Sequence, residues 1–160
     1  QGSRGGALRM TSVHNRVAVL HGVNFDVLDR RDPNVYGGLS LAELERKISD
    51  WAHELGLEPI FFQTNSEGEY CEYLHRSADL ADAAIVNAGA WTHYSRAIAD
   101  ALELTRLPAA EVHLSDVEAR DDWRKLSVFD GLVLAKISGK GPDGYREALE
   151  LLAGKLDVAS

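Results

Sequence analysis

Several side chains that could transfer protons or bind an anion follow the predicted strands of this chain. They are histidines, carboxylates and arginines. His113 stands two residues after Glu111, and alternation along a strand would point both side chains to the same face. A carboxylate beside an imidazole can orient the ring for general acid–base chemistry. His93 and Asn87 follow another apolar run. A single histidine is more often structural, but two at strand ends of one sheet, near arginines, indicate a ligand site.

A second group of candidates lies in the 15 residues from Phe25 to Leu39, which follow Asn24. A connection of this length between a strand and a helix is unusual and often forms a lid, so we predict a structureless lid here. The segment carries Arg31 and Tyr36, and Gly37-Gly38 could act as its hinge. A solvated loop with scattered charges is the alternative interpretation.

The elements that must position these residues are short apolar runs alternating with helical patterns. We predict strands at 16–20, 58–64, 83–86, 108–114 and 131–137. Helices are predicted at 41–55, where Ser40 and Glu43 have the spacing of a capping box, and through Tyr70, Leu74 and Ala78. Two more are predicted at about 93–104 and at 143 to about 152, with a polar loop at 115–124. This alternation predicts an α/β fold: a flavodoxin-like, doubly wound three-layer sandwich with a five-stranded parallel sheet in strand order 2-1-3-4-5. Its ligand would lie outside the carboxyl ends of the strands.

The composition limits the function classes. The chain has 160 residues, a formal charge of −8 and one cysteine, Cys71. We therefore expect one domain at 16–154, with no intrachain disulfide, no nucleic-acid partner and a cytoplasmic location. Residues 1–15 read as a tag remnant and disordered start, and 155–160 as a frayed tail. No apolar run approaches the roughly 20 residues that span a membrane. We predict no metal and no cofactor, because His93 with His113 is a weak ligand pair and no phosphate-binding glycine loop follows the first strand.

Five ordered blocks of the chain, between Val17 and about Leu152, resemble the type II 3-dehydroquinate dehydratases. The first is His21-Gly-Val-Asn24 with Arg31-Asp-Pro33 and Tyr36-Gly37; the others are Gln63-Thr-Asn65-Ser-Glu67-Gly68, Asn87-Ala-Gly-Ala-Trp-Thr-His93-Tyr-Ser95, Glu111-Val-His-Leu-Ser115 and Gly141-Pro-Asp-Gly-Tyr145. Because the blocks occur in the family's order, together they are far more specific than any one alone.

The resemblance implies elimination of water from 3-dehydroquinate, giving 3-dehydroshikimate through an enolate. Tyr36 would be the base as a phenolate, with the Arg31 guanidinium favouring the charged form of a group whose ordinary pKa is about 10. Asn24 would hold a water against the enolate oxygen, and His113 would be the general acid, oriented by Glu111. The implied substrate-binding residues are Asn87, His93, Leu114, Ser115 and Arg124, with Asp100 contributed by a neighbouring subunit.

The resemblance also implies an assembly of trimers that combine into a dodecamer. The substrate would be a small anionic ring, which a chain of charge −8 can bind because Arg31, Arg120 and Arg124 set the local field.

Eight positions depart from the family's pattern: His21, Val23, Asp29, Ala88, Tyr94, Arg96, Lys136 and Lys140. One interpretation is drift around an intact catalytic set. A second is a paralogue that dehydrates a modified dehydroquinate-like ring in a specialised biosynthetic pathway. A third, of a different class, is a non-catalytic flavodoxin-like binding module, in which Arg31 and Tyr36 would be dispensable.

Overall fold

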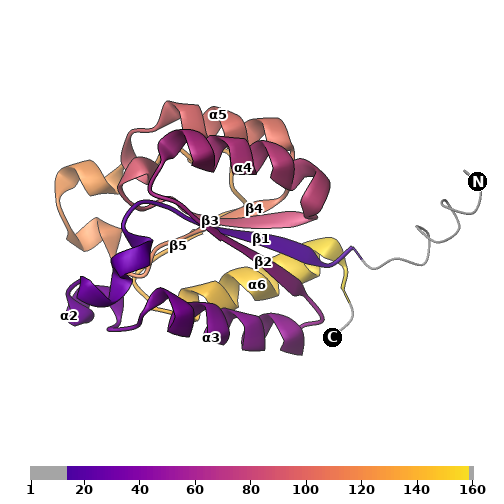
Figure 1. The fold of residues 1–160 in the computed structure, drawn as a ribbon, viewed down its shortest axis with the longest axis horizontal. Helices are drawn as coiled ribbons and strands as arrows, with labels where there is room; N and C mark the ends of the chain where they lie inside the picture. Colours follow the sequence, from indigo (N-terminus) through magenta and orange to yellow (C-terminus); the bar gives the residue numbers. More distant parts are fainter. Residues whose placement is uncertain (1–13, 159–160) are drawn as a thin grey trace, which may run out of the picture.

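Five parallel strands form the centre of the protein in a computed structural model that describes residues 14–158 (Figure 1). The predicted tag remnant and disordered start lies outside the described residues up to position 13, as do residues 159–160. The strands are β1 (Arg16–His21), β2 (Glu58–Gln63), β3 (Ala83–Asn87), β4 (Ala109–Val112) and β5 (Ala135–Ile137). They pair in the order β2-β1-β3-β4-β5, which confirms the predicted flavodoxin-like topology.

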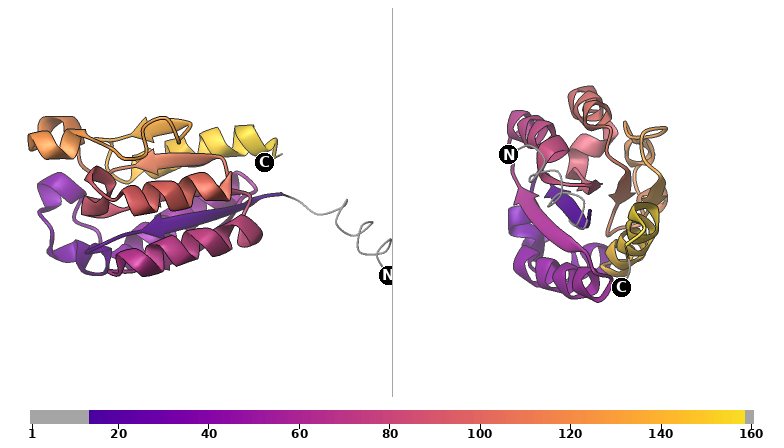
Figure 2. Two further views of the ribbon diagram at one scale, coloured as in Figure 1. Left: turned by 90° about the horizontal axis from the view of Figure 1, so that it is seen from above. Right: turned by 90° about the vertical axis from the view of Figure 1, so that its right-hand side faces the viewer.

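Two helices cover each face of the sheet, and strand alternation explains why both faces are apolar. On β1, Val17 and Val19 point to one core and Ala18 and Leu20 to the other. The first core is closed by α3 (Leu41–Glu54) and α6 (Asp143–Leu156), and the second by α4 (Glu67–Leu80) and α5 (Arg96–Thr105). The views in Figures 1 and 2 show the sheet enclosed between these helix pairs.

Serine side chains set where three helices begin. Ser40 accepts from the backbone N–H of Glu43, whose carboxylate accepts in return from the N–H of Ser40, the capping box that the sequence predicts. Ser66 caps α4, and Ser95 caps α5 by accepting from the N–H of Ile98.

The cap at Ser95 places the start of α5 later than predicted. His93 instead ends η2 (Gly89–His93), a 3-10 turn between β3 and α5. Its side chain is therefore held at the strand-end edge of the sheet.

The segment from Phe25 to Leu39 is not structureless, which corrects the prediction of its local structure. The segment contains η1 (Phe25–Arg30), a 3-10 helix, and α2 (Pro33–Tyr36). The side chain of Asp32 caps α2 and Pro33 occupies its first turn, a pairing typical of helix starts. Gly37 ends α2 at φ 89°, a left-handed conformation that glycine adopts without strain. In Figure 1 these elements lie at the opposite end of the sheet from the start of β1 and the end of α6.

Other predicted boundaries also need correction. β4 and β5 are shorter than predicted, because β4 has only three residues of β5 to pair with and Gly131 turns the chain at φ 85°. The polar loop contains two 3-10 turns, η3 (Val117–Ala119) and η4 (Asp122–Lys125). Helix α6 continues to Leu156, so the predicted frayed tail begins inside it.

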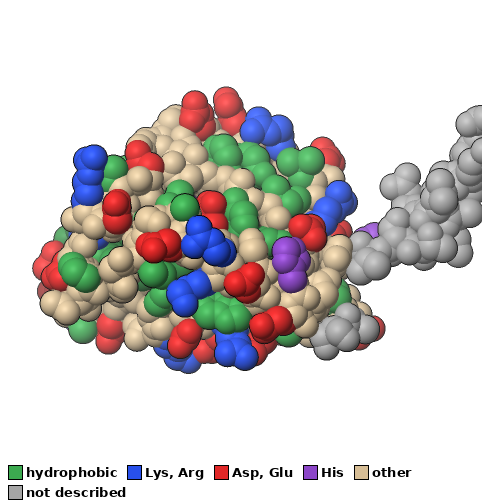
Figure 3. Space-filling model, turned by 60° about the horizontal axis from the view of Figure 1, so that its bottom comes forward, with side chains coloured by type: hydrophobic (Ala, Val, Ile, Leu, Met, Phe, Trp, Pro, Cys, Tyr) green, Lys and Arg blue, Asp and Glu red, His purple; other side chains and the backbone are tan. Residues whose placement is uncertain are grey.

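The surface carries charge of both signs. On the face that carries α3, acidic and basic side chains are interspersed with small apolar patches (Figure 3). Within residues 14–158, none of the helices combines the length and apolar character needed to span a membrane.

Candidate active site

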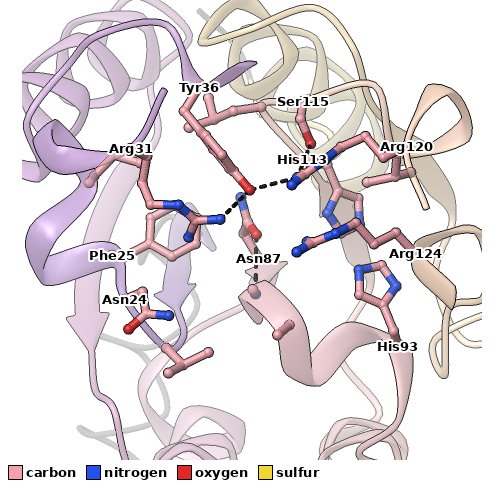
Figure 4. A pocket seen from close by; sticks show the side chains of 16 residues that line it. Asn24, Phe25, Arg31, Tyr36, Asn87, His93, His113, Ser115, Arg120 and Arg124 are labelled. Carbon is pink, nitrogen blue, oxygen red and sulfur yellow. Dashed lines mark hydrogen bonds between the residues drawn. The ribbon is translucent and has the colours of Figure 1, made fainter. Parts of the chain in front are cut away.

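A cavity opens at the carboxyl ends of the strands, between η1 and α2 on one side and η2 and η4 on the other (Figure 4). This edge of the sheet is where doubly wound folds bind ligands. Nine of the eleven predicted site residues line it: Asn24, Arg31, Tyr36, Asn87, His93, His113, Leu114, Ser115 and Arg124. Glu111 lies behind the wall, in contact with His113, and Asp100 lies elsewhere.

The phenol oxygen of Tyr36 lies between two guanidinium groups. Arg31 Nη2 donates to it at 2.5 Å and Arg120 Nη1 at 2.6 Å, from opposite sides in Figure 4. Arg120 Nη1 also donates to Ser115 Oγ at 3.3 Å. Hydrogen bonds from charged donors are the stronger kind, so these two contacts hold the phenol oxygen firmly in the cavity. The geometry therefore positions Tyr36 as a candidate proton acceptor.

His113 is held by a buried chain of polar groups. Its Nε2 lies 2.5 Å from Oε2 of Glu111, and the other oxygen of Glu111 accepts from Ser127 Oγ at 2.9 Å. Glu111 is fully buried and His113 is 5% exposed. Nε2 of His113 is therefore engaged with the carboxyl group of Glu111. Nδ1 is then the ring nitrogen left for proton exchange, so Glu111 sets the orientation that an acid would need.

His93 and Arg124 form the wall opposite Tyr36. The Leu126 carbonyl lies 2.6 Å from His93 Nδ1 and can only accept, so the hydrogen of the neutral ring sits on Nδ1 and Nε2 is bare. Burial lowers the pKa of His93, which favours this neutral ring. The indole of Trp123 meets the His93 ring edge to face at 5.2 Å, and its own face lies 4.2 Å from the Arg124 guanidinium.

A polar turn after β1 presents Asn24 to the cavity. Asn24 has φ 73°, a left-handed conformation that asparagine tolerates better than most residues. Its backbone N–H donates to Oδ1 of Asn65 at 2.8 Å, and Asn65 Nδ2 donates to Asp26 at 3.1 Å. The segment after β2 thus fixes this turn.

Asp100 lies apart from the other predicted site residues. It is exposed on α5 and does not line the cavity. Across the described range 14–158, histidine, cysteine, aspartate and glutamate side chains nowhere gather in a group of three that could hold a metal ion.

Of the eight departures from the resembled pattern, only Val23 lines the cavity. Its carbonyl lies 2.9 Å from where a Cβ on Gly89 would stand. His21 and Ala88 are buried behind the wall, while Asp29, Tyr94, Arg96 and Lys140 are exposed. Lys136 and Lys140 pair with Glu118 and Glu147 respectively.

Three functional contacts had no usable signal in the sequence. Ser127, the partner of Glu111, lies in no motif. Trp123 lies in the polar loop, where no motif indicates a role for it. Arg120 was expected to contribute to the local field, but its hydrogen bond to Tyr36 spans 84 positions and appears only in the folded chain.

Comparisons with known proteins agree with this geometry. A family model described as dehydroquinase class II matches residues 15–153. The 3-dehydroquinate dehydratase of Syntrophotalea carbinolica is 47% identical over 135 residues, which cover 84% of this chain and 91% of that protein. The 3-dehydroquinate dehydratase of Halothermothrix orenii is 43% identical over 146 residues, covering 91% and 99%.

Solved structures show the same likeness. The type II dehydroquinase from Propionibacterium acnes superposes with a TM-score of 0.84 at 37% identity, covering 90% of this chain and 99% of that one. The family model and the relatives together span nearly all of the described fold, including every residue that lines the cavity. The chain therefore belongs to the class II dehydroquinase family.

Proposed function

We propose that this protein dehydrates 3-dehydroquinate to 3-dehydroshikimate, with Tyr36 as the base. The observation that carries the proposal is the phenol oxygen held between Arg31 and Arg120 at 2.5 and 2.6 Å. A general base must be held where it can reach the proton that it removes, and these two contacts hold the phenol oxygen at the cavity. The family membership and the names of the relatives support the same reaction.

The reaction proceeds through an enolate. Tyr36 takes the proton α to the ring carbonyl, and the electrons of that C–H bond move onto the carbonyl oxygen. A water held by Asn24 donates to this oxygen. When the carbonyl re-forms, the C–O bond on the neighbouring carbon breaks, and His113 gives a proton to the leaving hydroxyl, which departs as water. The base is restored when Tyr36 releases its proton and His113 regains one.

The remaining cavity residues bind the anionic ring. Asn87, His93 and Arg124 would take its hydroxyl groups, and Leu114 with Ser115 would take its carboxylate. Three guanidinium groups at one cavity supply the field that attracts an anion to a chain of formal charge −8. The chemistry assigned here needs no metal or organic cofactor.

The test follows the absorbance of the conjugated enone as dehydroquinate is consumed. Tyr36→Phe should lower kcat by a factor of about 10² to 10⁴, the usual contribution of a positioned acid–base group. The matched control is Tyr73→Phe, which removes a hydroxyl from α4 outside the cavity and should leave kcat unchanged. Absence of any absorbance change with concentrated wild-type protein would remove the proposal and favour a non-catalytic binding module.

The same assay with ring analogues separates the plain enzyme from a paralogue. A higher kcat/KM for an analogue than for dehydroquinate would identify a modified ring as the substrate.

We further propose an assembly of trimers combined into a dodecamer, in which Asp100 of one subunit approaches the cavity of another. Light scattering should then report about 210 kDa, twelve times the 17.5 kDa chain. A monomeric mass would exclude the shared site. The cytoplasmic location also remains a prediction, which cell fractionation would test.

A further inference from the structure

A buried hydrogen-bond chain lies directly behind the cavity wall. His21 Nε2 is 2.8 Å from the hydroxyl oxygen of Tyr145, and Nδ2 of Asn87 donates to the same oxygen at 3.0 Å. His21 and Tyr145 have no exposed surface, and Asn87 is 3% exposed while lining the cavity. The mechanism above uses only Asn87. Of the two residues behind it, Tyr145 contacts the amide of Asn87 and His21 contacts Tyr145.

The side-chain amide of asparagine has a donor NH₂ group and an acceptor oxygen. Its hydrogen-bond partners therefore determine which of the two faces which side, and we call this orientation the polarity of the amide. Oδ1 of Asn87 accepts from the backbone N–H of Gly89 at 3.4 Å, and Figure 4 shows this bond. A flipped amide would set its NH₂ group against that N–H. Nδ2 must therefore face Tyr145, and the Tyr145 oxygen must accept from it.

The hydrogen on the Tyr145 hydroxyl then has one polar neighbour left. Burial raises the pKa of Tyr145, so the group remains a phenol at neutral pH. With Asn87 donating to its oxygen, the phenol can donate only to Nε2 of His21. That nitrogen must be bare to accept it.

His21 is suited to this role because it is neutral. Burial lowers its pKa to about 3. A neutral imidazole carries one hydrogen, and with Nε2 bare that hydrogen sits on Nδ1. Nδ1 is buried and has no hydrogen-bond partner within the part of the chain that the structure describes. Because Nδ1 has no partner in either tautomer, the contact between Nε2 and the Tyr145 hydroxyl determines which tautomer forms.

We propose that His21 and Tyr145 are positioning residues that fix the polarity of the Asn87 amide: the Nδ1–H tautomer of His21 accepts the Tyr145 hydroxyl hydrogen, and Tyr145 accepts from Asn87. The cavity then offers an acceptor beside Gly89 and a donor beside Tyr145. A ring hydroxyl at the first position must donate, and a ligand group at the second must accept. This consequence for the substrate rests on the proposed function, whereas the tautomer does not.

The tautomer is measured by solid-state ¹⁵N NMR on protein labelled at its histidine ring nitrogens, near neutral pH. The signals of His21 are those that disappear in His21→Gln. We expect a protonated Nδ1 and a bare, hydrogen-bonded Nε2. A protonated Nε2 would overturn the proposal, whatever the kinetics show.

Kinetics test the effect on Asn87 with two variants of one residue. Glutamine can place an amide oxygen near the position of Nε2 and accept from Tyr145, whereas leucine cannot. His21→Leu should raise KM about five-fold, the value of one neutral hydrogen bond, with kcat changed less than about two-fold. His21→Gln should stay close to wild type. Equal KM values for wild type and both variants would contradict the proposal.

Two failures of the assay remain distinguishable from failure of the proposal. If His21→Leu does not fold, the ¹⁵N spectrum of the wild type, assigned with His21→Gln, still shows which tautomer His21 adopts. If the wild type does not dehydrate dehydroquinate, the proposed function fails, and the ¹⁵N spectrum alone decides the tautomer.

Discussion

The buried imidazole of His21 should make this protein sensitive to acid. Burial lowers its pKa in the folded state to about 3, compared with an ordinary value of 6.5. Between these two values the unfolded chain binds a proton that the folded chain excludes. The free energy of unfolding therefore rises with pH across this window and falls as the solution is acidified.

The size of the effect follows from the shift. Each pH unit inside the window changes the free energy of unfolding by about 1.4 kcal/mol. From about pH 7 to about pH 5 the His21 contribution is a loss of about 2 kcal/mol, because titration of the unfolded chain begins near its ordinary pKa. This is a substantial part of the 5–15 kcal/mol typical of folded proteins.

Urea unfolding of wild type and His21→Gln at these two pH values measures the effect. Glutamine does not titrate, so the variant should lose about 2 kcal/mol less than wild type on acidification. Chain concentration must be constant, because association contributes to the measured stability. The other acid-sensitive groups, His93 among them, are present in both proteins and cancel in the comparison.

His75→Gln is the control, since His75 is exposed on α4 and its replacement removes a histidine without touching the buried chain. The reasoning would be refuted if the free energy of unfolding fell by the same amount on acidification in all three proteins: wild type, His21→Gln and His75→Gln. The folded state would then admit the proton at His21.

Three further predictions concern contacts at or near the cavity. Gly22→Ala should lower the free energy of unfolding by about 2 kcal/mol or more, measured in urea, because its Cβ would stand 2.3 Å from the Ala88 carbonyl oxygen; unchanged stability would show that the two chain segments can separate. Ser127→Ala should lower kcat about five-fold with little change in KM, because it removes a hydrogen bond that orients Glu111. Arg120→Gln should lower kcat at neutral pH by about ten-fold or more, because it removes one of the two charged donors to the proposed base; wild-type kcat would exclude a role for that charge.

Local signals were sufficient for most of the fold. Alternating apolar runs predicted the five strands, and Ser40 with Glu43 predicted the start of α3, because capping and strand alternation act between residues close in sequence. The same kind of signal is present at Asp32-Pro33, where α2 begins inside the segment predicted to be structureless. The ends of β4 and β5 were harder to predict, since each depends on how much partner strand is present.

For the candidate site, too, the sequence predicted some features and only the tertiary structure determined the others. From the sequence alone, ordered motifs identified nine residues that line one cavity, because the carboxyl ends of parallel strands must meet at one edge. Their orientation was decided only by the tertiary structure. Arg120 reaches Tyr36 across 84 positions, and His21 reaches Tyr145 across 124. Hydrogen bonds of this kind require distant segments to be positioned to within a few tenths of an ångström, and only the packing of the sheet and its helices determines those positions.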